Sequence, residues 1–168
     1  ALKNIPGSTF AIEGEPPLAL ILESMASAMG CGHFRIAPGD KPLYHVAAVF
    51  VSNYAVTLLK AGADLFSGMG ISTERAVEIL MPLVRGNVAN MEQAGLSDCL
   101  TGPIARGDSG TVEKHLDALQ ERFPAYLHLY ASLGLHTVPI AVQKKSISAE
   151  TSEALLEILS RTIDECRK

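Results

Sequence analysis

The 168 residues suffice for one domain with its own core, because a chain of this length buries roughly 70% of its unfolded surface on folding. Apolar residues make up 48% of the chain and charged residues only 19%, so we expect some apolar surface to be reserved for another domain or subunit. The 14 Lys and Arg residues are scattered and the formal net charge is -4, which argues against nucleic-acid binding.

Three further features indicate a cytoplasmic protein. The longest apolar run, residues 46–51, is far shorter than the ~20 residues that span a bilayer, so no transmembrane segment is expected. Cys31, Cys99 and Cys166 lie far apart without metal-ligand spacing, as expected of reduced thiols and of a chain without a metal site. The chain begins at Ala1 without a signal or transit peptide, and we expect it to start inside a longer protein.

A strand, a helix and a second strand are predicted at the beginning of the chain. Residues 9–13 alternate polar and apolar side chains, residues 18–29 repeat apolar side chains at helical spacing, and residues 33–37 alternate again. Strands joined by a helix pair in parallel, and two strands alone are marginal. We therefore expect this segment to be the last edge of a larger α/β domain encoded upstream, with a boundary near Asp40.

The remainder of the chain reads as helices. Residues 43 to about 69 are apolar on several faces, and a helix that apolar is expected to be buried. Ser72 is a good N-cap for the next helix, which is expected to be kinked by Pro82 and to end near residue 94, at Gly95.

A loop is expected over residues 97–109, and three helices follow it. Asp108 or Ser109 can cap the first of them, and Ser148 can cap the last. The predicted helices cover residues 111–123, 124–133 and 148–166. Residues 41–168 are therefore predicted to form a helical domain.

Two glycine pairs and one tripeptide imitate functional motifs. Gly30-x-Gly32 precedes a strand instead of following one, and Gly68-x-Gly70 joins two helices, so both favour helix ends over a phosphate loop. Arg106 begins an Arg-Gly-Asp adhesion tripeptide, but reduced cysteines and the missing signal peptide give it no extracellular context.

Polar residues lie within the most apolar predicted helix. His45 and Ser52 are seven residues apart and share a face, while Asn53 lies on its flank, about 12 Å along the axis from His45. A small polar substrate could lie along this row. Alternatively, Ser52 bonds back to a helix carbonyl, and His45 and Asn53 are satisfied inside a helix bundle. Both interpretations stay open at this point.

Residues 100–108 are the densest functional-looking segment. The glycines allow a ligand to approach the backbone, Arg106 offers a fork for a carboxylate or phosphate, and Asp108 can orient that arginine. Alternatively, this is an ordinary helix connection in which Asp108 is an N-cap and Arg106 is solvated. His115 lies one to two turns into the next helix and could point back at the loop.

Residues 43–54, 100–108 and 115–116 together resemble a known family. In this domain-of-unknown-function family, a helical C-terminal domain follows a Rossmann-like NADP-binding domain. The wider resemblance is to the 6-phosphogluconate dehydrogenase C-terminal-domain-like superfamily, which includes ketopantoate reductases. It implies a mainly α fold, with a multi-helical bundle over residues 41–168 preceded by the strand-helix-strand remnant of a Rossmann-like α/β domain over residues 1–40.

The resemblance also implies an activity. It points to an NADP-dependent oxidoreductase that reduces a small 2-oxo acid such as ketopantoate, with NADP bound mainly by the missing upstream domain. Ordinary ketopantoate reductases carry a lysine followed by two asparagines, at places where this chain has His45, Val49 and Asn53. Without that lysine, His45 is the candidate proton donor, and Asn53 is the candidate hydrogen-bond partner of the substrate carbonyl or hydroxyl.

Six further residues are candidates for substrate binding: Ser52, Thr101, Gly102, Arg106, Asp108 and His115. Arg106 would hold a substrate carboxylate, Thr101 and the Gly102 backbone would line the pocket, and Asp108 would fix the loop. The cofactor-binding residues stay unknown, because no glycine-rich loop follows a strand in this chain.

A homodimer is the expected assembly, since helical domains of this superfamily commonly form intertwined dimers. On this interpretation the isolated chain is inactive. The alternative function is a non-catalytic helical dimerisation or scaffold module whose polar residues are merely satisfied in the interior.

Overall fold

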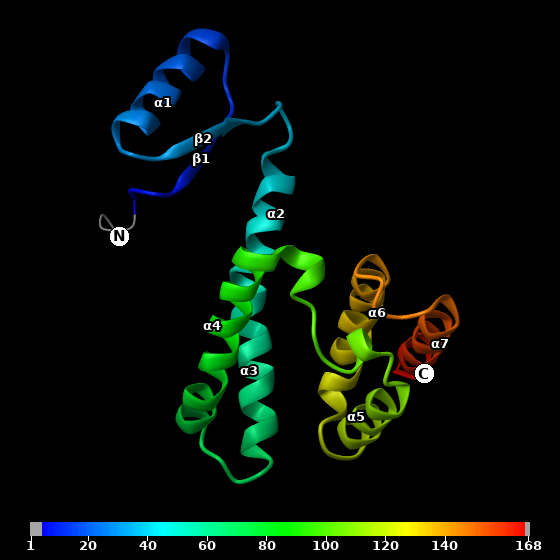
Figure 1. Cartoon of the computed structure of the whole chain (residues 1–168). Coiled ribbons are helices and arrows are strands. Elements are labelled where there is room, and N and C mark those ends of the chain that lie inside the picture. Colours follow the sequence, from blue (N-terminus) through cyan, green and yellow to red (C-terminus); the bar gives the residue numbers. More distant parts are fainter. Residues whose placement is uncertain (1–4, 167–168) are drawn as a thin grey trace. The chain divides into compact units, whose positions relative to one another are not determined.

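The computed structural model describes residues 5–166 and is mainly helical, with one small parallel sheet (Figure 1). The chain divides into two compact units, one ending at Thr57 and the other beginning at Leu58. The mainly α architecture predicted from the sequence is confirmed at this coarse level. The domain boundary predicted near Asp40 stays a prediction.

The first unit carries the predicted strand, helix and strand. β1 (Thr9–Ile12) and β2 (Gly32–Arg35) pair in parallel, as predicted, and α1 (Pro16–Ala28) is the crossover between them. Two prolines open α1, where the first N–H groups need no helical partner. Gly30 follows the helix with a positive φ of 71°, a conformation that glycine adopts without strain.

The core of this first unit is small. Its buried apolar residues are Ile12, Ala19, Ala26 and Cys31. Large apolar side chains of α1 are instead exposed: Leu18, Leu20, Ile21 and Met25. Two strands and one helix bury too little apolar area to be stable by themselves, so this unit needs a further packing partner.

The long apolar helix predicted over residues 43–69 is divided in two. α2 (Lys41–Val51) and α3 (Asn53–Ser67) meet at Ser52, where φ is -103° and ψ is -68°. The prediction that this segment is buried is wrong for the single chain, because α2 buries no residue and α3 buries only Ala63. An apolar composition indicates that a helix packs against a partner, but it does not indicate whether that partner belongs to the same chain.

The helical stretch Lys41–Ser67 is long and apolar enough to cross a membrane, by length and composition alone. Its most apolar window has a mean hydropathy of 1.4 and is 6% buried. The short run of residues 46–51 understates this segment, because Ser52 and Asn53 interrupt the run without removing its apolar average. Core helices of other proteins meet the same criteria, so the expected absence of a membrane partner stays a prediction.

α4 (Thr73–Asp98) lies beside α3 (Figure 1). Ser72 caps it as predicted, with its hydroxyl oxygen accepting a hydrogen bond from the Arg75 N–H at 3.3 Å. The backbone leaves the helical conformation at Gly95, with φ 80° and ψ 172°, whereas Pro82 lies within the helix. The predicted end at Gly95 is therefore an interruption, after which a short helical segment continues to Asp98.

The last three helices build the main core. They are α5 (Ser109–Arg122), α6 (Leu127–Gln143) and α7 (Ala149–Cys166), with the 3-10 turns η2 (Ile104–Arg106) and η3 (Pro124–Tyr126) on either side of α5. Asp108 and Ser148 cap α5 and α7, as predicted, each accepting a hydrogen bond from a backbone N–H three residues on. The buried core residues are Ile104, Val112, Leu116, Leu119, Leu127, Ala131, Val138, Ala141, Leu155 and Leu159.

α6 runs well beyond its predicted end near residue 133. Gly134 and Pro139 lie inside it, although both residue types disfavour helix interiors. A Cβ on Gly134 would lie 2.8 Å from Leu159 Cδ2, so glycine lets α6 approach α7 closely. Burial of Val138 and Ala141 in the core offsets the local cost, because full burial of an aliphatic side chain is worth about 1.5–3 kcal/mol.

Candidate functional site

The polar row predicted on the long helix lies in the first unit. His45 is on α2, Ser52 is at its end, and Asn53 begins α3. All three are exposed, and none of their side chains takes part in a hydrogen bond described within residues 5–166. The alternative that they are satisfied inside a bundle therefore does not hold within a single chain. Their side chains remain available to a ligand or a partner.

The loop predicted over residues 97–109 lies in the second unit and includes η2. Thr101 and Arg106 are exposed, and Gly102 has a positive φ of 95°. Lys144 holds the entry to this loop, because its Nζ donates to the carbonyl oxygens of Asp98 at 2.9 Å and of Leu100 at 2.8 Å. Sequence reasoning missed this lysine, since only the fold brings it to the end of α4.

Asp108 acts as a helix cap. Its Oδ1 accepts from the Thr111 N–H at 3.0 Å, and its Oδ2 accepts from the Thr111 hydroxyl at 2.7 Å. These bonds, the hydroxyl bond first, hold the pKa of Asp108 below its ordinary value. Asp108 is therefore the N-cap of α5, as predicted, and no described hydrogen bond or ion pair between residues 5 and 166 joins it to Arg106.

His115 pairs with a residue that sequence reasoning missed. Its Nδ1 lies 2.9 Å from the hydroxyl of Tyr130 on α6, and the two rings meet edge to face at 5.8 Å. Burial raises the pKa of Tyr130, so its hydroxyl stays protonated. The one available signal was a tyrosine inside an apolar helix, because a partly buried hydroxyl usually finds a polar partner.

Tyr130 separates two cavities in the second unit. A cavity of about 310 Å³ is lined by Leu65, Met69, His115, Ala118, Leu119, Arg122, Phe123 and Tyr130. A cavity of about 250 Å³ is lined by Thr101, Pro103, Ile104, Tyr130, Leu133, Gly134 and Thr137. The structure thus brings Thr101 and His115 to cavities that share one tyrosine, whereas Gly102, Arg106 and Asp108 line neither of these two.

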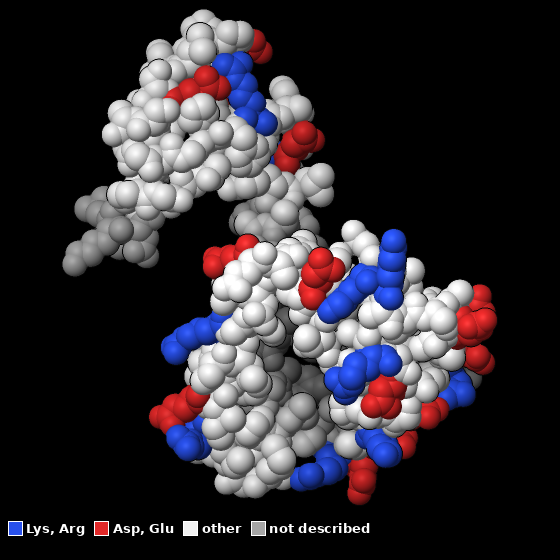
Figure 2. Space-filling view, viewed as in Figure 1, with Lys and Arg blue, Asp and Glu red and all other residues white. Residues whose placement is uncertain are grey.

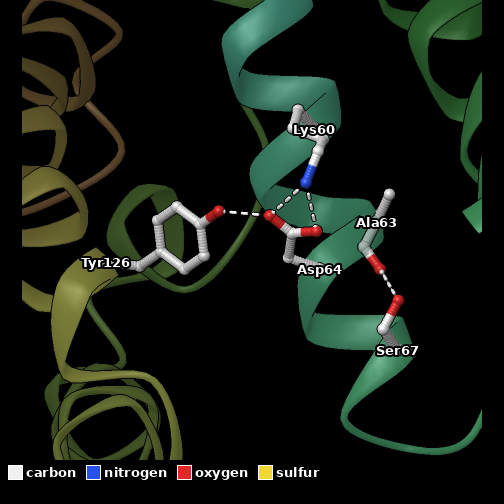
Figure 3. Close-up of polar contacts among 5 residues, drawn as sticks. All are labelled: Lys60, Ala63, Asp64, Ser67 and Tyr126. Atoms are coloured by element: carbon white, nitrogen blue, oxygen red, sulfur yellow. Dashed lines mark hydrogen bonds and ion pairs between the residues drawn. The ribbon is translucent and has the colours of Figure 1, made fainter.

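A cluster of polar side chains joins α3 to η3 (Figure 3). Lys60 Nζ lies 2.7 Å from Asp64 Oδ2, and the Tyr126 hydroxyl donates to the same carboxylate. Lys60 first, and Tyr126 second, lower the pKa of Asp64, while the bond to Asp64 raises the pKa of Lys60. Each of the three side chains has a hydrogen-bond partner within the cluster, so the cluster stabilises the packing of η3 against α3.

The first unit does not fit the pyrophosphate of a dinucleotide. β1 is followed by Glu13 and Glu15, and the first turn of α1 begins with Pro16 and Pro17, which have no N–H to donate. Two carboxylates beside a helix start without those donors repel a phosphate instead of binding it. A cavity of about 330 Å³ does lie between β1, α1 and the start of α2, but its lining is mainly apolar.

Neither a metal cluster nor a basic patch stands out. Residues 5–166 contain no group of three or more His, Cys, Asp or Glu side chains that could hold a metal ion. On the face seen in Figure 2, acidic and basic side chains are interspersed over the second unit, and the first unit carries few charges. The visible face therefore offers no stripe of one sign.

Comparison with known proteins gives one family and one similar structure. The family described as Domain of unknown function (DUF2520) matches residues 8–137. The crystal structure of protein TM1727 from Thermotoga maritima is similar, with a TM-score of 0.68 and 22% identity over 95% of this chain and 55% of that chain. No curated protein matches. This chain thus spans about half the length of its structural neighbour, and the likeness concerns the fold.

Proposed function

Since the chain belongs to the family described as Domain of unknown function (DUF2520), we propose that it is the substrate-binding and dimerisation part of an NADP-dependent oxidoreductase. The proposed substrate is a small 2-oxo acid such as ketopantoate. The family match agrees with the resemblance to a domain-of-unknown-function family, while the assignment to the 6-phosphogluconate dehydrogenase C-terminal-domain-like superfamily belongs to this proposal.

The observation that carries the proposal is the incomplete α/β unit. A parallel pair of strands with one crossover helix is an unusual unit by itself, and its helix exposes Leu18, Leu20 and Ile21. Such a pair is the natural edge of a larger parallel sheet, of the kind that binds dinucleotides. The poor fit of residues 13–17 to a pyrophosphate is consistent with NADP being held elsewhere in the whole protein.

The proposed roles follow from residue chemistry. His45 donates a proton to the carbonyl oxygen as it is reduced, because an imidazole can deliver a proton near neutral pH. Asn53 and Ser52 hydrogen-bond the substrate oxygens. Arg106 pairs with the substrate carboxylate; no hydrogen bond or ion pair described within residues 5–166 holds its guanidinium, which interacts with Asp108 only through their opposite charges. The exposure of these side chains supports this reading.

Residues of the loop and of the helix after it have supporting roles in this proposal. Asp108 holds the end of the loop through its cap on α5, Thr101 lines the substrate pocket, and the Gly102 backbone, which lines neither cavity beside Tyr130, contacts the substrate from the loop. His115 contributes a ring nitrogen from the next helix.

The test uses the whole protein, together with any segment that precedes this chain. Oxidation of NADPH is followed by absorbance with ketopantoate, and then with a panel of small 2-oxo acids and imines. Turnover with one of them supports the proposal. No turnover with any compound, from protein that is folded and binds NADPH, contradicts it.

A second candidate function is a non-catalytic dimerisation module. The observation that favours it is the exposed apolar surface of α3 and α4, which bury only Ala63 and Ala76. The exposed side chains include Val56, Leu58, Leu83, Val88 and Leu96. A second copy of the chain would cover this surface, as interfaces of obligate dimers resemble a divided core. A stable dimer without turnover would favour this candidate.

A further inference from the structure

The cavity of about 310 Å³ beside Tyr130 has an ordered arrangement of polar and apolar groups. One face of α5 supplies His115, Ala118, Leu119 and Arg122, which follow helical spacing. Along the helix axis, the first and last of these lie about 10 Å apart. This row of side chains is therefore apolar in its middle and has a nitrogen-bearing side chain at each end, His115 near the middle of α5 and Arg122 at its last residue.

The remaining walls are apolar. They come from Leu65 and Met69 at the end of α3 and from Phe123 after α5. No Asp or Glu belongs to the described lining of this cavity. An anion that enters it therefore meets a guanidinium without an opposing carboxylate in the lining.

The contact with Tyr130 is compatible with a His115 tautomer that carries its proton on Nε2. The protonated Tyr130 hydroxyl can donate to Nδ1 at 2.9 Å, and a neutral imidazole that accepts at Nδ1 carries its proton on Nε2. No contact described within residues 5–166 occupies Nε2. That N–H is then a donor for an acceptor group of a ligand.

Arg122 is held by a hydrogen bond to the backbone that follows α3. One of its Nη atoms donates to the carbonyl oxygen of Gly68, which leaves other N–H groups of the guanidinium for a ligand. Glycine is required at Gly68 by close packing, since a Cβ there would lie 2.3 Å from Phe123 Cζ. The cation is therefore anchored at the cavity edge by the backbone.

We propose that this cavity binds an elongated small carboxylic acid, with its carboxylate at Arg122, its apolar chain along Ala118 and Leu119, and a second acceptor group at His115. The volume lies at the lower end of the range for small-molecule sites, and a few placed polar groups in an apolar lining are typical of them. The inference concerns binding alone and needs neither the proposed cofactor nor the proposed reaction.

The test is calorimetric titration of the full chain with three probes, without any nucleotide. Suberate carries a carboxylate at each end, octanoate has the same chain length and one carboxylate, and succinate is too short to reach both ends. We expect suberate to bind about tenfold more tightly than octanoate, and succinate not to bind. Equal affinity for all three, or no binding of suberate, overturns the proposal.

Four variants locate the site. Ala118→Leu fills the middle of the cavity at an exposed helical position and is expected to abolish suberate binding while far-UV circular dichroism is unchanged. Tyr130→Phe is expected to weaken suberate severalfold but to leave octanoate unchanged, because it affects only the His115 end. Arg122→Gln is expected to weaken both. Glu113→Gln, exposed on the same helix and outside the cavity lining, is the control.

The variants also show how the proposal fails. Suberate binding that survives Ala118→Leu places the acid elsewhere on the protein. An equal loss of suberate and octanoate in a folded Tyr130→Phe variant contradicts the role of His115 at the far end. Either result overturns the proposal, whether or not the whole protein oxidises NADPH.

Discussion

The Tyr126 hydroxyl donates a hydrogen bond to the Asp64 carboxylate, and the two residues lie 62 positions apart in the sequence. This bond joins η3 to α3, and Lys60 holds the same carboxylate from one turn earlier. Tyr126→Phe keeps the ring and removes only the donor. We expect a lower urea midpoint with an unchanged m-value, because one tertiary hydrogen bond is lost without a change in exposed area. Tyr54→Phe, at an exposed tyrosine without a described hydrogen bond, is the control and should leave the midpoint unchanged.

The cap at Asp108 makes the stability depend on pH. Its hydrogen bonds from Thr111 hold the pKa of Asp108 below the ordinary value of 3.8. A lowered pKa in the folded state means that the stabilisation is fully present above the unfolded value and is lost as the pH falls through the folded value. Asp108→Asn retains a capping oxygen and removes the titration, so its unfolding free energy should fall less steeply below about pH 4. Parallel acid-unfolding curves for the two proteins would contradict this.

We expect a side chain at Gly134 to disturb the packing of α6 against α7 and to lower the stability of the protein. A Cβ at this position would lie 2.8 Å from Cδ2 and 3.0 Å from Cδ1 of Leu159, which is completely buried, so the Leu159 side chain or the helices must shift. Gly134→Ala should therefore cost about 1–3 kcal/mol of unfolding free energy in urea denaturation. Gly86→Ala is the control: nothing lies within 4 Å of its Cβ, so alanine should stabilise α4 by up to about 1 kcal/mol.

Introducing a charge on the exposed face of α4 tests whether a second copy of the chain covers that face or whether the face meets water. Leu83 is 64% exposed in the single chain, so Leu83→Glu costs little if that face meets water. If a second copy covers the face, the dissociation constant of the dimer should rise about 30-fold or more. Sedimentation equilibrium measures this directly, with Glu157→Lys on the exposed face of α7 as the charge-change control. An unchanged dimer would remove this face from the interface.

His45→Ala tests the proposed proton donor in the whole protein. Turnover of the 2-oxo acid should fall by a factor of order a hundred or more, because a positioned acid contributes about that much to catalysis. The matched variant His136→Ala changes an exposed histidine on α6 and should retain full turnover. Equal activity of the two variants would remove His45 from the mechanism.

The elements that could be predicted are those with local signals. Ser72, Asp108 and Ser148 mark three helix starts correctly, because a capping side chain bonds to a backbone N–H within the same turn. The end of α6 could not be predicted, because the burial of residues after Gly134 depends on α7. The burial predicted for residues 43–69 is wrong for a related reason: the segment is helical and apolar as predicted, but the described residues of this chain leave most of it exposed.

The candidate site likewise contains residues that the sequence identifies and residues that only the fold brings together. His115 was identified from its distance to the loop along the sequence, whereas Tyr130 lies 15 positions further on and reaches it only through the packing of α5 against α6. Lys60 and Asp64 had a readable spacing of one helical turn, yet no local signal points to Tyr126. Tertiary partners of this kind require the fold.

The order of the elements along the chain has a consequence for synthesis at the ribosome. The buried core is drawn from one contiguous stretch, between Ile104 and Leu159, so it closes through short loops and should form quickly once it is complete. That completion waits for α7, the last of these core helices to emerge. The apolar α2 and α3 are made much earlier, and most of their residues stay exposed in the finished chain as well. Slow translation of the second half would therefore prolong the phase in which the core residues are exposed in addition to α2 and α3, and chaperone demand should be greatest before α7 is released.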